Sequence, residues 1–199
     1  LDGYKLSKIK KFVNSKTLFV IISKSGKTLE TLTNLIVFKS FMKSNNSLII
    51  TEKSNNALYN LAKKKKYKLL LHEKFVGGRF SILSKSSLIP LKLLGLKKNI
   101  TPEQFSKYLA NKKIFKELCL QASKISNFYL DKKYKSIACL SYASELNDLI
   151  FWFQQLSAES LGKKGKGLMP FLSICPKDHH SLLQLYLDGP KDKIFYIFD

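Results

Sequence analysis

Acidic residues and arginine are scarce in this chain of 199 residues. It has 14 Asp and Glu against 35 Lys and Arg, a formal net charge of +21 at pH 7, and Arg79 is its only arginine. Such an excess of positive charge raises the question of a nucleic-acid or anionic membrane partner. Base readout and stacking favour arginine, however, and the lysines are spread along the whole chain. We therefore expect a solvated lysine background, with no nucleic-acid partner and no membrane binding; a basic nucleic-acid binder is the alternative that charge alone supports.

Cysteine is also scarce, and long apolar runs are absent. The three cysteines, Cys119, Cys139 and Cys175, show no CxxC spacing, which argues against a disulfide framework and against a zinc site. We expect buried free thiols in a reducing cytosol. Apolar stretches such as residues 87–95 are interrupted well before the roughly 20 residues that cross a bilayer. The chain begins without a secretory signal or an initiator Met, so we expect a piece of a longer protein.

Two kinds of apolar segment alternate along the chain and predict an α/β fold. Runs rich in β-branched and aromatic residues predict strands, and apolar residues at helical spacing predict helices. The predicted strands cover residues 17–22, 47–51, 67–71, 136–141, 169–175 and 193–198. The predicted helices cover residues 29–43, 56–64, 80–94, 143–161 and 180–188, and more helices fill most of 102–130 after the capping box Thr101-Pro102-Glu103-Gln104. This order predicts doubly wound parallel sheets with ligands at the carboxyl ends of the strands.

The first predicted strand leads into a polar loop, Ser23-Lys24-Ser25-Gly26-Lys27-Thr28, just before a helix. Free backbone amides and the positive end of the helix dipole favour an anion at such a place, and the three hydroxyls add donors. The loop is not a P-loop, because that motif needs a glycine where the chain has Ile21. An ordinary Ser/Thr helix cap is the alternative. We interpret the loop as a cradle for the phosphate of a small metabolite.

Arg79 follows Gly77 and Gly78 after a predicted strand. We expect the glycines to permit a sharp turn that aims the guanidinium at the strand ends, where a delocalised, permanent charge suits an oxyanion. A surface salt bridge is the alternative.

Three candidate residues lie on one face of the helix predicted over 143–161: Trp152, Gln155 and Glu159. We expect Glu159 to be a partly desolvated carboxylate, which suits a general base acting on a weakly acidic C–H bond. An ion pair with Lys163 is the alternative. His179 and His180 open the next helix and suit proton transfer, but without a third ligand they predict no metal site.

Four segments in this order resemble the glucose-6-phosphate isomerase (phosphoglucose isomerase) family in its bacterial form: SKSGKTLET at 23–31, GGRFS at 77–81, WFQQLSAESLGK at 152–163 and DHHSLLQLYLDGP at 178–190. The resemblance implies the sugar isomerase (SIS) fold, with doubly wound parallel sheets in a three-layer α/β/α arrangement. It implies a first subdomain over residues 1–100, a helical connection over 101–134 and a second subdomain over 135–199, each subdomain lacking an end. The family's upstream Gly-Gly-Ser motif and its C-terminal lysine have no counterpart here, and His179 stands where the family usually has Gln.

The resemblance also implies an activity and a role for each site residue. It implies an isomerase that interconverts glucose 6-phosphate and fructose 6-phosphate through an enediolate, in cytoplasmic glycolysis and gluconeogenesis, with no metal or organic cofactor. By matching position, Glu159 would move the proton between C1 and C2, Arg79 would stabilise the enediolate, and His180 would assist ring opening across the interface of a homodimer. The implied contacts of the sugar phosphate are Ser23, Lys24, Ser25, Gly26, Lys27, Thr28 and Gln155. A non-catalytic SIS module that binds a phosphosugar is the alternative.

Overall fold

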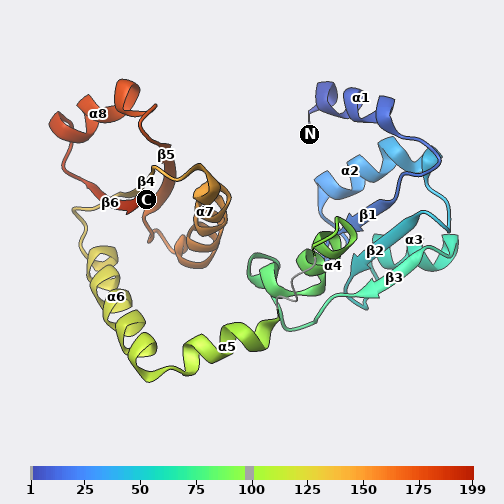
Figure 1. The fold of residues 1–199 in the computed structure, drawn as a ribbon, viewed down its shortest axis with the longest axis horizontal. Helices are drawn as coiled ribbons and strands as arrows, with labels where there is room; N and C mark the ends of the chain where they lie inside the picture. The colour runs from blue at the N-terminus through green and yellow to red at the C-terminus, as the bar shows by residue number, and fades with distance from the viewer. Residues whose placement is uncertain (1, 97–100) are drawn as a thin grey trace. The chain divides into compact units, whose positions relative to one another are not determined.

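The computed structural model describes residues 2–96 and 101–199 (Figure 1). Its contacts divide the chain into two compact units, Leu1–Gln104 and Phe105–Asp199, and each unit has its own three-stranded sheet. The subdomain boundary that we expected at residue 100 lies outside the described residues. The division into two subdomains and a helical connection therefore stays a prediction.

The first unit is built on three parallel strands in the order β1-β2-β3. They are β1 (Phe19–Ile22), β2 (Ser47–Thr51) and β3 (Lys68–Leu71). Every residue of β2 is buried, as expected for the central strand of a parallel sheet. The connecting helices α2 (Leu29–Phe38) and α3 (Ala57–Lys65) bury Leu35 and Leu58 in one core with Ile49 of β2.

The remaining elements of this unit are α1 (Gly3–Phe12), the short 3-10 helices η1 (Lys39–Phe41) and η2 (Gly78–Leu83), and α4 (Lys85–Leu93). The prediction of one helix over 80–94 is wrong, because the helical conformation is interrupted at Ser84. The Ser84 hydroxyl oxygen accepts a hydrogen bond from the Ser86 amide and lies 2.7 Å from the Ser86 hydroxyl. Serine competes for backbone bonds inside helices and is favoured at their first cap, so Ser84 ends η2 and begins α4.

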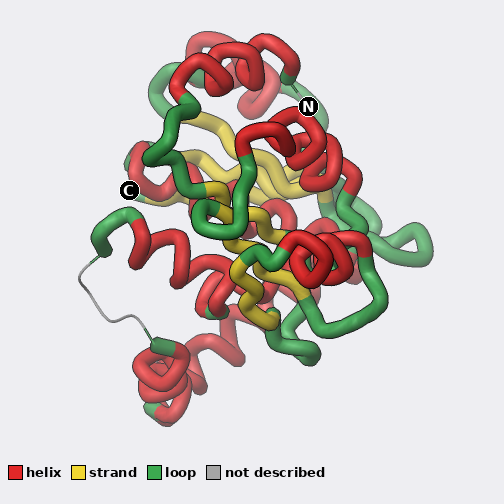
Figure 2. Tube along the Cα trace, turned by 90° about the vertical axis from the view of Figure 1, so that its right-hand side faces the viewer, coloured by secondary structure: helices red, strands yellow, loops and turns green. Residues whose placement is uncertain are grey.

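The second sheet has the order β5-β4-β6 and is also parallel throughout. Along the chain the elements are α5 (Pro102–Ala110), α6 (Lys112–Leu130), β4 (Ser136–Ser141), η3 (Ser144–Leu146), α7 (Asn147–Leu161), β5 (Met169–Ile174), α8 (His179–Asp188) and β6 (Lys193–Phe198). Figure 2 marks helices in red and strands in yellow along the chain. The expected capping box is confirmed, since Thr101 and Gln104 exchange side-chain to backbone hydrogen bonds.

Helices lie on both faces of the second sheet. Ile137 of β4 packs on one face with Ile150 of α7 and Phe128 of α6. On the other face the ring of Tyr186, from α8, lies 5.2 Å from that of Phe195 in β6. The predicted three-layer α/β/α fold class is confirmed.

The thiols differ from one another in exposure. Cys139 and Cys175 are buried and free, as we expected, but Cys119 is exposed. The expectation is wrong for Cys119 because it lies on α6, in which no residue is buried.

None of the helices formed by residues 2–96 and 101–199 combines the length and the apolar character that a membrane span requires.

Candidate functional site

The loop between β1 and α2 turns some of its polar groups inward and others outward. The Ser23 side chain is buried, accepts a hydrogen bond from the Gly26 amide at 3.1 Å and lies 2.8 Å from the Thr28 hydroxyl. Ser25, Lys27 and Thr28 are exposed. Thr28 is the first cap of α2, but its side chain makes no capping bond to the helix. The ordinary helix-cap alternative is therefore wrong for Thr28. The exposed groups of the loop lie at the start of a helix, a place that favours a bound anion.

The shape of this loop depends on Asn56, which the sequence analysis did not include among the candidate site residues. Asn56 is buried and begins α3, where its side-chain oxygen accepts a hydrogen bond from the Tyr59 amide at 2.9 Å. The same side chain packs directly on Gly26. The pattern of an Asn before an apolar helix could have predicted the cap, but no local pattern predicts the contact with Gly26.

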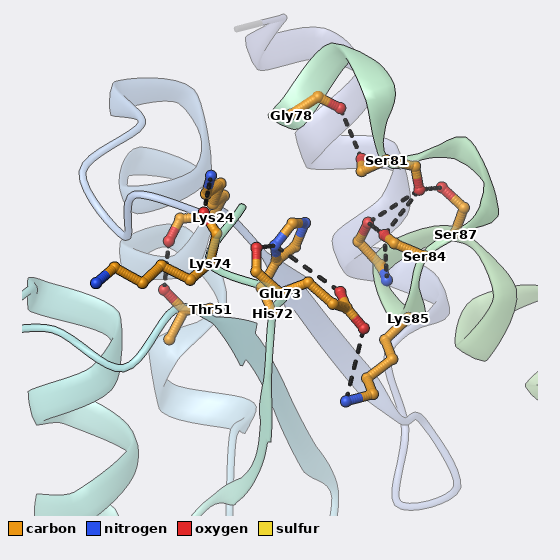
Figure 3. A network of polar contacts seen from close by, with 11 residues as sticks. Lys24, Thr51, His72, Glu73, Lys74, Gly78, Ser81, Ser84, Lys85 and Ser87 are labelled. Carbon is orange, nitrogen blue, oxygen red and sulfur yellow. Dashed lines mark hydrogen bonds and ion pairs between the residues drawn. The ribbon is translucent and has the colours of Figure 1, made fainter. Parts of the chain in front are cut away.

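The contact of Lys24 with the sugar phosphate stays a prediction. Its ammonium donates a hydrogen bond to the backbone carbonyl of Lys74, at 2.8 Å (Figure 3). Lys74 belongs to the segment that leads from β3 to Arg79.

Arg79 lies in the first turn of η2, beyond the carboxyl end of β3. Its guanidinium lies 4.9 Å from the centre of the Phe80 ring. Gly77 has φ −65°, and Gly78 has no positive φ either, so neither glycine adopts a backbone conformation that other residues avoid. Gly77 instead leaves room for Phe80, whose ring would stand 3.3 Å from a Cβ at that position.

A buried histidine supports the segment between β3 and Arg79. The imidazole Nδ1 of His72 lies 2.9 Å from the Glu73 backbone carbonyl and 4.0 Å from the Glu73 carboxylate (Figure 3). That carboxylate also lies 3.6 Å from the Lys85 ammonium at the start of α4. Its second oxygen, Oε2, is buried without a hydrogen-bond partner. We call residues 72–79, which lead from the end of β3 to Arg79, the Arg79 segment. The contacts join β3, this segment and α4 into one polar network.

In the second unit, Gln155 and Glu159 are brought together on α7. The Gln155 side-chain amide donates a hydrogen bond to the Glu159 carboxylate at 2.9 Å. Their shared helix face is therefore confirmed. Glu159 is exposed, however, so the expectation of a partly desolvated carboxylate is wrong for this chain. A cavity of about 540 Å³ lies beside the pair, between the end of α7 and the start of β5, and Gln155, Lys166 and Pro170 are among its lining residues.

The two histidines at the start of α8 have different surroundings. The Nε2 atom of His179 lies 3.0 Å from the Tyr142 hydroxyl, and their rings meet edge to face. Loss of hydration, together with the nearby Cys175 thiol, raises the pKa of Tyr142. The neighbouring His180 is exposed.

Glu159 and His180 lie at opposite edges of the second sheet, where an edge means the row of strand ends: Glu159 is at the amino ends of the strands and His180 at their carboxyl ends. Glu159 is near the end of α7, which leads into the start of β5, whereas His180 follows the carboxyl end of that strand. Six strand residues at about 3.3 Å each separate the two edges by roughly 20 Å. We expected ligand contacts at the carboxyl ends of strands; Glu159 and Gln155 lie at the other edge.

Among residues 2–96 and 101–199, no three His, Cys, Asp or Glu side chains gather in a way that could hold a metal ion.

The comparisons with known proteins converge on one family. The family model described as "Phosphoglucose isomerase" matches residues 1–168. The glucose-6-phosphate isomerase of Methanocaldococcus jannaschii is 39% identical over 196 residues, which are 95% of this chain and 49% of the relative. That of Mycoplasma capricolum is 37% identical over 188 residues, which are 88% of this chain and 43% of the relative. The chain thus spans about half the length of the curated relatives it matches.

Solved structures agree on the fold. A hypothetical protein from Thermus thermophilus superposes with a TM-score of 0.84 at 27% identity, over 99% of this chain and 51% of that one. A glucose-6-phosphate isomerase from Chlamydia trachomatis superposes with a TM-score of 0.74 at 20% identity, over 98% of this chain and 42% of that one.

Proposed function

Because the chain belongs to the phosphoglucose isomerase family, we propose that it interconverts glucose 6-phosphate and fructose 6-phosphate. The observation that carries the proposal is the loop after β1. Its exposed Ser25, Lys27 and Thr28 stand at the start of a helix whose first cap, Thr28, makes no side-chain capping bond to the helix amides, which is a suitable place for a sugar phosphate.

The proposed reaction is a proton transfer between neighbouring carbons of the open-chain sugar. The Glu159 carboxylate takes the proton from C2 of the aldose and returns it to C1, while the hydroxyl proton passes from O2 to O1 in the intermediate, and the reverse path converts the ketose. The enediolate formed between the two steps carries negative charge on oxygen, which the Arg79 guanidinium stabilises. Gln155 supports this role of Glu159, because the hydrogen bond between them orients the carboxylate. The proposed steps need neither a metal nor an organic cofactor.

His180 has a separate role in the proposal, the opening of the sugar ring. We place it in the site of the partner subunit of a homodimer. Its position at the opposite edge of the sheet from Glu159 supports this assignment, since roughly 20 Å is too far for one sugar phosphate to contact both groups of the same chain.

The cellular setting that we propose is cytoplasmic glycolysis and gluconeogenesis. The three free cysteines support a reducing compartment, because a protein made for an oxidising one would normally pair such thiols.

Two measurements test the proposal. Calorimetric titration with fructose 6-phosphate should show saturable binding, which Ser25→Ala weakens about fivefold through the loss of one hydrogen bond. In D2O the protein should exchange the C2 proton of glucose 6-phosphate. Glu159→Gln should retain binding and lose this exchange by at least about a hundredfold.

Glu145→Gln is the matched control, because Glu145 is also exposed but lies in η3. It should leave both measurements unchanged. Binding without any exchange in the wild-type protein would indicate a phosphosugar-binding module instead of an enzyme, and the absence of both would overturn the proposal.

A further inference from the structure

Lys24 follows the end of β1 and makes hydrogen bonds at the end of β2 and beyond the end of β3. It follows Ser23 directly after β1, and its backbone carbonyl accepts hydrogen bonds from the Thr51 hydroxyl at 3.1 Å and the Glu52 amide at 3.0 Å, at the end of β2. Its ammonium donates to the Lys74 carbonyl at 2.8 Å, beyond the end of β3. Figure 3 shows Lys24 together with Thr51 and Lys74, and dashed lines mark the hydrogen bonds that it makes with each.

The bond to Lys74 connects two segments that the proposed reaction uses. Lys24 belongs to the anion-binding loop, and Lys74 lies three residues before Gly77, where the turn that carries Arg79 begins. A bond between an ammonium and a carbonyl is charge-assisted, and such bonds are stronger than those between neutral groups. This exposed hydrogen bond holds the start of the Arg79 segment against the loop.

The network around His72 anchors the Arg79 segment on its other side. Lys24 fixes the carbonyl of Lys74, while the preceding residue, Glu73, contacts His72 and Lys85 through its carboxylate. The residues between this anchor and Arg79 include a turn in which the Val76 amide bonds to the Glu73 carbonyl. Movement at Lys74 would therefore be passed on to Arg79 through only the four residues between them.

We propose that Lys24 is a positioning residue, whose ammonium sets the place of the Arg79 turn relative to the anion-binding loop. The ammonium acts through Lys74 and not on the phosphate. In this proposal the exposed loop residues Ser25, Lys27 and Thr28 bind the anion. Lys24 contributes to the later step, because it positions Arg79 to stabilise the negative charge of the enediolate. The consequence for turnover rests on the proposed function; the structural link between the two segments does not.

The first test uses amide hydrogen exchange in the 199-residue chain. Lys24→Met keeps the length of the side chain but removes its donors. We expect the Val76 and Phe80 amides, which bond to the Glu73 and Gly77 carbonyls, to exchange about five to ten times faster in this variant. Lys24→Arg retains a donor and should restore most of the protection. Lys53→Met is the matched control, since Lys53 is an exposed lysine beside the same strand ends, and it should change nothing.

The second test separates positioning from phosphate binding. Lys24→Met should bind inorganic phosphate within about threefold of the wild-type affinity, while lowering the kcat of isomerisation about tenfold or more with a smaller change in KM. Unchanged exchange at Val76 and Phe80, or a loss of phosphate affinity as large as the loss of turnover, would overturn the inference. The exchange result stands even if the wild-type chain does not isomerise the sugar, so failure of the proposed function can be told apart from failure of this inference.

Discussion

Gly26 and Asn56 lie so close together that no side chain fits between them. A Cβ built on Gly26 would stand 1.8 Å from the side-chain oxygen of Asn56, and Gly26 has φ +62°, in the left-handed region. Asn56 cannot easily withdraw, because the same oxygen caps α3 and its amide group donates to the Glu52 carbonyl and the Ser54 hydroxyl. The first cap of α3 thus supports the loop that precedes α2.

Gly26→Ala should therefore be strongly unfavourable. The left-handed conformation and the clash with Asn56 act together, and we expect a loss of about 2–3 kcal/mol in the free energy of unfolding. Binding of fructose 6-phosphate should weaken as well, because the loop must shift. Urea unfolding and calorimetry measure the two effects. Gly3→Ala is the control, since a Cβ there meets nothing within 4 Å. Unchanged stability would contradict the importance of the Gly26 contact.

Ser23 and Ser25 provide a second contrast within the same loop. Ser23→Ala removes a buried hydroxyl that bonds both Gly26 and Thr28, so it should lower the free energy of unfolding by about 1–2 kcal/mol. Ser25→Ala removes an exposed hydroxyl and should change stability by less than about 0.5 kcal/mol. Thermal unfolding of both variants checks this order. Equal losses would mean that the inward and outward roles of the two hydroxyls are wrong.

The elements that the sequence predicted best are those with a continuous local signal. The bounds of β2, β4 and β6 agree with the predicted strands residue for residue, since each is a short apolar run bounded by polar residues. The helix over 80–94 failed at Ser84, where a local capping preference is stronger than the apolar spacing. The sequence also placed Gln155 and Glu159 together, because helical spacing alone puts residues four apart on one face.

What escaped prediction depends on residues far apart in the chain. Lys24 and Lys74 are 50 positions apart, and nothing local to either residue indicates that the ammonium bonds to that carbonyl. The contact of Asn56 with Gly26 is of the same kind. The exposure of Cys119 and Glu159 depends on which helix faces are covered, and apolar periodicity predicts a covered face without saying what covers it.

Burial of Cys139 predicts a loss of stability at alkaline pH. Burial raises the pKa of this thiol from about 9 to about 11, so the unfolded chain releases the proton first as the pH rises. The stabilisation is complete below pH 9 and should disappear between about pH 9 and 11, at a cost of up to about 2 kcal/mol. Urea unfolding at several pH values measures it. Cys139→Ala removes this contribution, and the difference between the two chains cancels the titration of the many lysines. Parallel pH curves would contradict the assignment.

The placement of His180 in the partner's site can be tested by mixing two inactive variants. Glu159→Gln lacks the proposed base, and His180→Asn lacks the imidazole proposed to open the ring, so each alone should isomerise glucose 6-phosphate at a small fraction of the wild-type rate. In a mixed dimer, one site would combine the intact Glu159 of one subunit with the intact His180 of the other. Random reassociation makes half of the dimers mixed, with one good site in two, so activity should return to about a quarter of the wild-type value.

Differently tagged subunits show whether mixed dimers have formed, and each variant measured alone at the same total concentration is the control. Recovery requires that the two residues serve one site from different chains, because no site built within one subunit becomes intact on mixing. The opposite sheet edges occupied by Glu159 and His180 lead to this expectation. Mixed dimers without recovered activity would indicate that His180 acts in the site of its own chain. The α8 segment would then have to move by most of the length of β5 to bring His180 near Glu159.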